Sequence, residues 1–448
     1  MQGRGTFSNK IGFVLAAAGS AVGLGNIWRF PYLAAHYGGM FLITYLLLVV
    51  TFGFTVMLTE ISIGRKTGKS PIGAFSALHK KSGFIGWIAV IVVAIIFPYY
   101  GVIGGWVTKY LAAFLVGAQP TVATSAEFFN GYISQNIQPI LWQLLFMLAT
   151  GIVVARGVEK GIEKASRVMM PILIVLTIVI AVYSVCLPGA MEGVKYFLIP
   201  DFSKFSVNMI LAAMGQMFYS MSLAMGIMIT YGSYLRKKDD LEKSVSQIEL
   251  FDTGIAVLAG FMIIPAVVAF NGVDGLSSGP GLMFVTLPQV FDSMPFGQFV
   301  GIIFFLLVLF AALTSSISIM EALVSTLCDQ FGFSRIKSSV LILFWGILVG
   351  LIPSLGFGAW SHITVFGMDL LTFMDFITNS ILMPIGAFLT CTFVGYFLGV
   401  QQIADEIELS SKFRRKKLYI VMVRYIAPVF ILAILISSVL SAFGWVTL

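Results

Sequence analysis

The stretch AGSAVGLGNIWRFP, residues 18–31, lies inside the first long apolar segment and places three glycines, Asn26 and the charged Arg29 at membrane depth. Each glycine destabilises a helix interior by about 1 kcal/mol relative to alanine, and a backbone carbonyl freed in lipid is costlier still. Such a stretch is stable where its backbone lines a polar cavity, with amides for an anion and carbonyls for a cation. A glycine-rich packing face between helices is the alternative, but it accounts for neither Asn26 nor Arg29.

The composition indicates a polytopic membrane protein. Of 448 residues, 58% are hydrophobic and 10% are charged, which excludes an ordinary soluble domain. The net charge of +7 is dispersed among loops, so it does not indicate nucleic-acid binding. Cys186, Cys328 and Cys391 are isolated and the three histidines lie far apart, so neither a disulfide framework nor a metal cluster is predicted.

Eleven apolar runs are long enough to span a bilayer. They cover residues 11–33, 39–64, 84–116, 138–155, 168–188, 207–235, 245–271, 296–328, 338–354, 370–399 and 419–446. If the N-terminus is cytoplasmic, the lysines and arginines outside cytoplasmic loops are only Arg29, Lys109, Lys195 and Lys204. This asymmetry follows the positive-inside rule and, with an odd number of spans, predicts an extracytoplasmic C-terminus.

A second interruption, GQMFYSMSLAMG, occupies residues 215–226 in the sixth span. The first span starts from the cytoplasm and the sixth from the outside, so equivalent breaks in both predict an inverted five-plus-five repeat with its site between them. We expect one transporter domain over 1–448, with repeats at 11–190 and 207–400 and an additional span at 419–446.

These motifs, together with ALTSSISIME in the eighth span, resemble the neurotransmitter:sodium symporter family along essentially the whole chain. The eleven-span form resembles the bacterial amino acid transporters of that family. The resemblance implies an all-α, LeuT-type membrane protein that is not an enzyme and imports amino acids with Na⁺ across a bacterial inner membrane by alternating access. Expected partners are an amino acid, Na⁺ and membrane lipid, with no nucleic acid.

Two sodium sites follow from the resemblance. The site beside the substrate maps to the carbonyl of Ala21 and to Asn26, Ser220 and Asp252. The second site maps to the carbonyls of Gly19, Val22 and Ala311 and the hydroxyls of Thr314 and Ser315. Such oxygens can replace water around a hard cation, although on its own the TSS triplet would equally suit helix packing.

Asp252 departs from the pattern of many relatives, which carry asparagine there and need chloride bound by a serine four residues later. Here the later residue is Ala256. An ionised Asp252 would supply the negative charge, so no chloride is predicted. The alternative is a protonated aspartate or one that bonds between helices.

Gly23 stands where the monoamine transporters of the family carry aspartate, which leaves room for a substrate carboxylate. The resemblance places this carboxylate at the amides of Leu24 and Gly25, at Tyr100 and at one Na⁺. The remaining substrate contacts map to Ala21, Ile96, Tyr219, Ser220, Ser222, Met225, Ser315 and Ile319. This mostly apolar set predicts neutral hydrophobic or aromatic L-amino acids; another small zwitterion or amine, or an ion channel, remains the alternative.

The family's gates also map onto this chain. The outer gate corresponds to Arg29, Asp375, Tyr219 and Tyr100, and the inner gate to Arg4, Phe7, Tyr234 and Asp329. Phe7 stands where tryptophan is usual. Gly161 and Pro171 resemble a motif for local unwinding of the fifth span, unless that span simply begins near its proline. Glu60 is expected to brace the broken helices.

Overall fold

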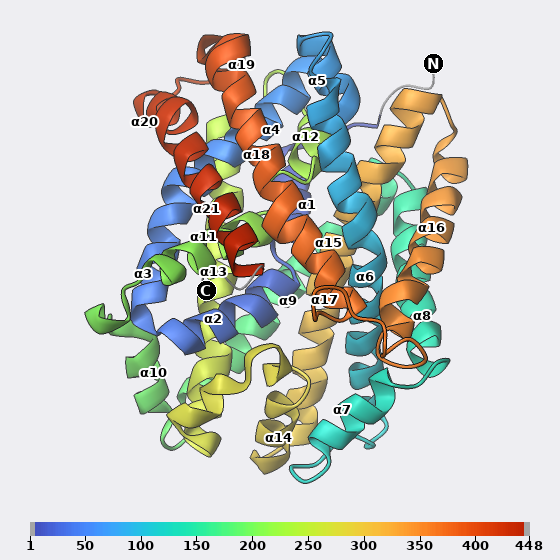
Figure 1. The fold of residues 1–448 in the computed structure, drawn as a ribbon, viewed down its shortest axis with the longest axis vertical. Helices are drawn as coiled ribbons and strands as arrows, with labels where there is room; N and C mark the ends of the chain where they lie inside the picture. Colours follow the sequence, from blue (N-terminus) through green and yellow to red (C-terminus); the bar gives the residue numbers. More distant parts are fainter. Residues whose placement is uncertain (1–4, 443–448) are drawn as a thin grey trace.

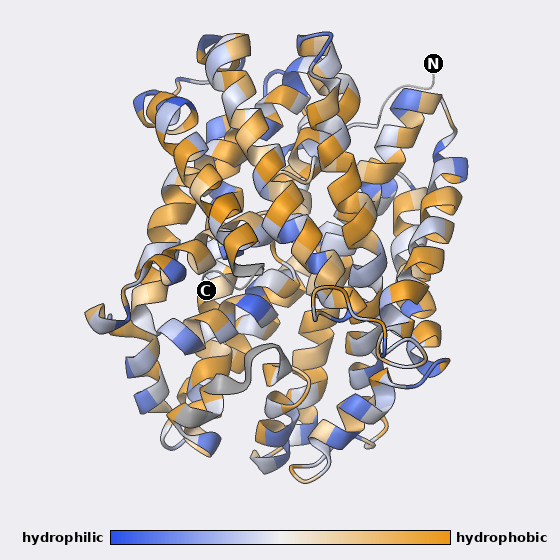
Figure 2. Ribbon diagram, in the orientation of Figure 1, coloured by the Kyte–Doolittle hydropathy of each residue, from blue (hydrophilic) through white to orange (hydrophobic). Residues whose placement is uncertain are grey.

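The computed structural model describes residues 5–442, without the side chains of residues 274, 277–280 and 441–442. Within these residues the regular structure is helical, and the long helices run roughly along the long axis of the molecule (Figure 1). Helices α5, α19 and α20 lie at one end, and α7, α10 and α14 lie at the other. Apolar residues cover most of the helical surface between the two ends (Figure 2), as lipid requires.

Nine helical segments are long and apolar enough to cross a membrane, and a bent pair at the start of the described chain makes ten. The bent pair consists of Lys10–Ala21 and Gly25–Tyr37, with 49° between them. The predicted sixth span is occupied by two shorter helices on either side of a break. The predicted all-α membrane architecture with breaks in the first and sixth spans is therefore confirmed.

The helices that precede the second break follow one another along the chain in the same order as the predicted spans. They are α1 (Lys10–Ala21), a π-helical turn (Gly25–Arg29), α2 (Phe30–Tyr37), α3 (Gly39–Leu48), α4 (Phe54–Thr67), α5 (Pro71–Leu78), α6 (Gly83–Leu115), α7 (Ser125–Ile133), α8 (Gln138–Ala155), α9 (Lys164–Val185), α10 (Ala190–Leu198) and α11 (Val207–Ser220).

The remaining helices follow the break. They are α12 (Ile227–Gly232), α13 (Leu241–Asn271), α14 (Thr286–Ser293), α15 (Gly297–Phe331), α16 (Arg335–Leu355), α17 (Leu370–Asp375), α18 (Met383–Thr392), α19 (Val400–Glu408), α20 (Lys416–Val421) and α21 (Ala427–Ala442). Further π-helical turns lie at Val49–Gly53, Val158–Glu163, Phe376–Leu382, Phe393–Gly399 and Met422–Ile426, and 3₁₀ turns at Phe202–Lys204 and Val273–Leu282. The tenth span thus continues as helix to Glu408, beyond its predicted end at 399.

One side chain of the first span and one from α11 satisfy the first break. Asn26 accepts a hydrogen bond from the Gly23 amide (3.0 Å), and the side-chain amide of Gln216 on α11 donates to the Gly25 carbonyl (2.8 Å). Both polar side chains are buried. They replace the partners that a continuous helix would have provided, because water is absent at this depth.

The second break, residues 221–226, is a left-handed path in which Ser222, Ala224 and Gly226 have φ of 53°, 60° and 69°. The conformation costs the non-glycine residues about 1–2 kcal/mol each. Buried hydrogen bonds offset this strain. The Ala224 amide donates to Glu60 on α4 (2.7 Å), and the Ser222 hydroxyl donates to the Ser20 carbonyl on α1 (3.1 Å). Glu60 therefore lies against the break that it was expected to brace.

Helices α4 and α12 pack with their backbones in close approach. A Cβ built on Gly64 would overlap the Ile229 carbonyl, and one built on Gly232 would overlap that of Ile61. Small residues permit such approach between membrane helices.

We therefore expect Gly64→Ala to lower the unfolding temperature of the detergent-purified protein by several degrees, because backbone atoms must move to admit the methyl group. The matched control is Gly254→Ala in α13, where a Cβ meets no atom within 4 Å. This control should unfold at the wild-type temperature or slightly above it, since alanine is the better helix former. Equal unfolding temperatures for the two variants would contradict the packing argument.

Candidate functional site

A small cavity of about 20 Å³ lies between the two breaks. It is lined by Ser20, Ala21, Gly23, Leu24, Gly25, Ile96, Tyr100, Tyr219, Ser222, Met225, Ser315 and Ile319. The structure thus brings together every predicted substrate residue except Ser220, which lies in the polar cluster described below. Ser20 is an addition that the sequence analysis did not single out, although it lies in the first motif between the predicted site residues Gly19 and Ala21.

The walls of this cavity are close to the glycines of the first break. A Cβ on Gly23 would overlap the Ser315 hydroxyl and lie 3.1 Å from the Tyr100 hydroxyl. A Cβ on Gly25 would lie 2.9 Å from Cδ1 of Tyr219. The Leu24 amide points to the Tyr100 oxygen at 3.5 Å. Because Gly23 and Gly25 carry no side chain, the backbone amides of the first break remain accessible to a molecule bound in the cavity.

A buried polar cluster adjoins the cavity. Oδ1 of Asp252 on α13 accepts hydrogen bonds from the side chains of Asn26 (2.8 Å) and Ser220 (2.8 Å). Tyr45 on α3 places its hydroxyl 3.4 Å from both Ser220 Oγ and Asp252 Oδ2. Asn26, Ser220 and Asp252 are therefore together as predicted, whereas Tyr45 was missed because a single tyrosine in an apolar span carries no distinguishing pattern.

The residues predicted to form the second ion site also converge. The Ser315 hydroxyl on α15 lies 3.4 Å from the Gly19 carbonyl and 3.5 Å from that of Val22. The Thr314 hydroxyl lies 3.1 Å from the Ala311 carbonyl. Carbonyl and hydroxyl oxygens of this kind suit a hard cation such as Na⁺. Among the described residues there is no group of three or more histidine, cysteine or acidic side chains that could hold a metal.

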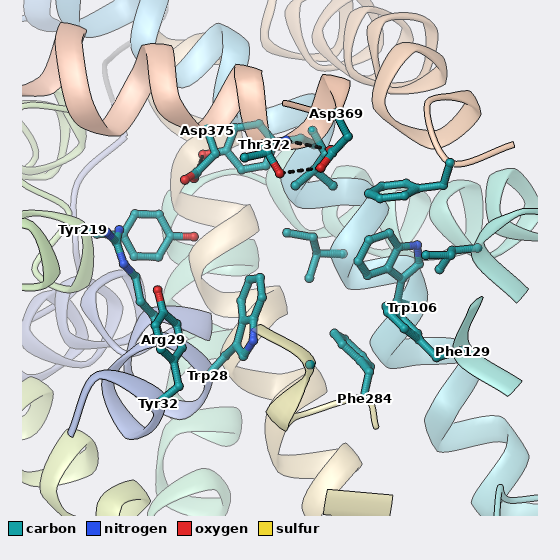
Figure 3. A pocket seen from close by; sticks show the side chains of 16 residues that line it. Trp28, Arg29, Tyr32, Trp106, Phe129, Tyr219, Phe284, Asp369, Thr372 and Asp375 are labelled. Atoms are coloured by element: carbon teal, nitrogen blue, oxygen red, sulfur yellow. Dashed lines mark hydrogen bonds between the residues drawn. The ribbon is translucent and has the colours of Figure 1, made fainter. Parts of the chain in front are cut away.

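A larger cavity of about 490 Å³ lies beyond Tyr219, whose ring borders both spaces. Its walls are largely aromatic, and they carry Arg29 and Asp375 at the left and Asp369 at the top of the view (Figure 3). The lining residues include Trp28, Arg29, Tyr32, Tyr99, Trp106, Phe129, Tyr219, Phe284, Phe357, Asp369 and Asp375. Phe129 of α7 and Phe284, which precedes α14, line this outer cavity, and α7 and α14 lie at the same end of the molecule (Figure 1).

Arg29 and Asp375, the predicted outer pair, both line this cavity, but no ion pair joins them in the described structure. Asp375 instead accepts a hydrogen bond from Tyr99 (3.1 Å) and another from Asn379, while the Arg29 guanidinium lies 5.5 Å from the Tyr219 ring centre. Tyr100 lines only the inner cavity. The outer gate residues are therefore gathered around the cavity without closing it.

The opposite end of the site is closed by packed rings. Phe7 contacts Phe13, Tyr231 and Tyr234 with ring centres 5.6–6.1 Å apart. Asp329 accepts a hydrogen bond from the Ser70 amide (2.7 Å). Arg4, its predicted partner, lies outside the described residues.

The same end contains a group that was not assigned from the sequence. The Tyr234 hydroxyl donates to Glu321 (2.6 Å), and Arg335 on α16 forms an ion pair with this carboxylate. Glu321 is fully buried. Glu321 is the last residue of the ALTSSISIME motif, so the sequence shows a carboxylate in the eighth span. Its cationic partner Arg335 belongs to the next helix, α16, and nothing in the sequence pairs the two residues.

Gly161 lies in the π-helical turn Val158–Glu163, and Pro171 lies inside the continuous helix α9. The predicted unwinding segment is thus a widened helical turn in this structure. A buried carboxylate on this turn, Glu163, binds Ser8 and Arg167, which attaches the start of the described chain to the fifth span.

Two broken helices around a buried polar cavity define a class of membrane transporters. A family model described as the sodium:neurotransmitter symporter family matches residues 4–130 and 121–444. The chain belongs to this family, and it is therefore a transporter and not an enzyme.

Similar proteins extend over the whole chain. An uncharacterized sodium-dependent transporter of Bacillus subtilis (strain 168), YhdH, is 36% identical over 97% of both chains. One from Haemophilus influenzae is 34% identical over 97% of this chain and 98% of its own. The crystal structure of MhsT in complex with L-phenylalanine is 38% identical, with a TM-score of 0.90 over 97% of this chain and all of MhsT.

Proposed function

We propose that this protein imports neutral hydrophobic or aromatic L-amino acids together with Na⁺ by alternating access, without chloride. The observation that carries the proposal is the cavity between the two breaks, where glycine amides and buried oxygens face apolar side chains. The similarity to MhsT, whose structure contains L-phenylalanine, supports the substrate class.

The two ends of an amino acid would meet different groups. The carboxylate would be held by the amides of Leu24 and Gly25, by the Tyr100 hydroxyl and by one Na⁺. The amine would meet the carbonyls of Ala21, Tyr219 and Ser222. The apolar side chain would lie against Ile96, Met225 and Ile319, which line the same cavity.

The cavity of about 20 Å³ has room for about one water molecule. An amino acid therefore enters only when the wall moves. Met225 is suited to this because an unbranched thioether adapts to different shapes. Tyr219 separates the cavity from the outer one, so its displacement would admit the substrate.

Alternating access is supported by the contrast between the two ends. The outer cavity extends to Tyr219, whereas rings around Phe7 close the other end. We place Arg29, Asp375, Tyr219 and Tyr100 in the outer gate and Arg4, Phe7, Tyr234 and Asp329 in the inner gate. The turn at Gly161 and Pro171 would open a water path to the second ion.

We further propose that the N-terminus is cytoplasmic and the C-terminus extracytoplasmic in a bacterial inner membrane, because the basic residues gather in loops at one side. The repeats are 11–190 and 207–400, with 419–446 as an addition. One net charge moving down about 100 mV releases about 2.3 kcal/mol, which supports roughly a fifty-fold substrate gradient.

Substrate binding should require Na⁺, because the carboxylate completes the shell of the ion held by Ala21, Asn26, Ser220 and Asp252. We expect L-phenylalanine to raise the unfolding temperature in NaCl and to leave it unchanged in KCl at equal ionic strength. Gly254→Ala lies two residues from Asp252, but its added Cβ meets no atom within 4 Å, so this variant should retain the response in NaCl. Equal binding in the two salts would reject the symporter assignment while leaving the fold intact.

Met225→Phe replaces a pliable side chain by a larger, rigid ring, so bulky substrates should lose more affinity than small ones. The difference between tryptophan and alanine in competition binding should change by about 1–3 kcal/mol. Met228→Phe is the matched control, since Met228 is buried nearby but does not line the cavity. Parallel changes for all substrates would remove Met225 from the proposed side-chain pocket.

Uptake should be independent of chloride because Asp252 supplies the negative charge that two Na⁺ and a zwitterion require in a site of low dielectric. Tyr45 and Ser220 already lie beside this carboxylate. The variant Asp252→Asn with Ala256→Ser should be weak in gluconate and partly restored in chloride. Wild-type uptake into proteoliposomes should be the same in both anions; a collapse in gluconate would give Asp252 another role.

A further inference from the structure

An apolar groove of about 290 Å³ lies on the surface of the bundle where α6 begins, between α6 and the segment that joins α18 to α19. Its walls are Phe84, Ile85, Leu389, Thr392, Phe393 and Phe397, and its rim is formed by His79, Lys81 and Ser82. None of these residues belongs to the transport site or its gates.

The groove belongs to the lipid-facing surface. Its walls come from Gly83–Leu115 and Leu370–Glu408, both of which are long and apolar enough to cross a membrane. Phe84 is 53% exposed and Phe397 80% exposed, whereas Ile85 and Phe393 form a buried floor. The Phe393 ring packs edge-on against Phe75 of α5, with ring centres 5.7 Å apart. The π-helical turn Phe393–Gly399 widens the helix along this wall.

The rim is built as a fixed turn. The Ser82 hydroxyl donates to the carbonyls of Phe75 and His79, both at 2.7 Å, and the Lys81 amide lies 3.4 Å from His79 Nδ1. Lys80 and Lys81 are exposed at this turn, immediately before α6 enters its apolar stretch. Lys81 therefore lines the rim of the apolar groove, and Lys80 is its neighbour in the same exposed turn.

The charge of this rim is not balanced by the protein. Some other cations at the same end of the described structure have carboxylate partners: Arg65 and Lys237 pair with Glu406, and Lys416 with Glu408. In the part of the chain that the structure describes, Lys80 and Lys81 form no ion pair. A mobile anion with an apolar tail would complement both the rim and the walls.

We propose that this groove binds one anionic phospholipid, with an acyl chain along Phe84, Leu389 and Phe397 and the phosphate at Lys80 and Lys81. Zwitterionic lipid fits the walls but not the unbalanced charge. A second copy of this chain would have to bring carboxylates to the same rim. An anionic phospholipid combines a negative headgroup with acyl chains, and it is already present in the membrane beside this groove.

The test is native mass spectrometry of the full-length protein, purified in detergent and titrated with phosphatidylglycerol or phosphatidylcholine of identical acyl chains. Wild type should retain one phosphatidylglycerol in preference to phosphatidylcholine. Lys80→Gln with Lys81→Gln should weaken that binding about twenty-five-fold, since each lysine at an anionic headgroup contributes a factor of about five. Lys80→Arg with Lys81→Arg should retain it.

Two further variants separate the groove from general surface charge. Lys238→Gln with Lys243→Gln removes the same charge from exposed positions near α13 and should leave phosphatidylglycerol retention unchanged. Phe84→Ala with Phe397→Ala keeps both lysines but removes two exposed aromatic rings from the groove wall. This variant should weaken phosphatidylglycerol retention several-fold.

Three outcomes would overturn the proposal. Equal retention of the two lipids by wild type would remove the role of the headgroup. Equal losses in the two glutamine variants would assign the binding to diffuse charge. A lipid-free dimer that the phenylalanine variant dissociates would make a second copy of the chain the occupant. Size-exclusion profiles and unfolding temperatures would identify any variant that fails to fold.

Discussion

The structure depends on one constraint, which is that a helix broken inside a membrane must find partners for its backbone within the protein. Asn26 and Gln216 provide these partners at the first break, and Glu60 does so at the second. Ser20 and Ser222 then join the two breaks to each other. Buried polar side chains therefore gather around the two breaks, and buried ion pairs such as Arg65–Glu406 and Arg335–Glu321 lie elsewhere in the bundle.

The same constraint explains what could be predicted from the sequence. Glycines, an amide and a charge in an apolar run have few structural interpretations, so both breaks and the helical class were recognisable. The cavity residues followed from motif resemblance. Tyr45 and the Glu321–Arg335 pair did not, because their roles arise only when separate spans meet. The sequence also could not predict that Arg29 and Asp375 are separated in this structure, since the sequence of a transporter does not specify which conformation a structure adopts.

The two cavities differ in how their shapes arise. The inner one is bounded by backbone whose path is constrained by glycines and by left-handed residues such as Ala224. The outer one is bounded by aromatic side chains, which can turn without any change in the helices that carry them. Tyr219 lines both cavities, so a movement of this single ring would connect the outer cavity to the inner one.

The small volume of the inner cavity also has a consequence for hydration. Under the proposed function, the inner cavity of about 20 Å³ leaves no room for a water shell, so an amino acid would lose most of its hydration before it passes Tyr219. A side chain with a hydroxyl or amide would then meet Ile96, Met225 and Ile319, together with serine hydroxyls that already donate to the Ser20 carbonyl. Its lost hydration would be only partly replaced, and each buried polar group left without a partner costs several kcal/mol. Under the proposed function, weaker binding of polar amino acids would thus follow from desolvation and would require no steric clash.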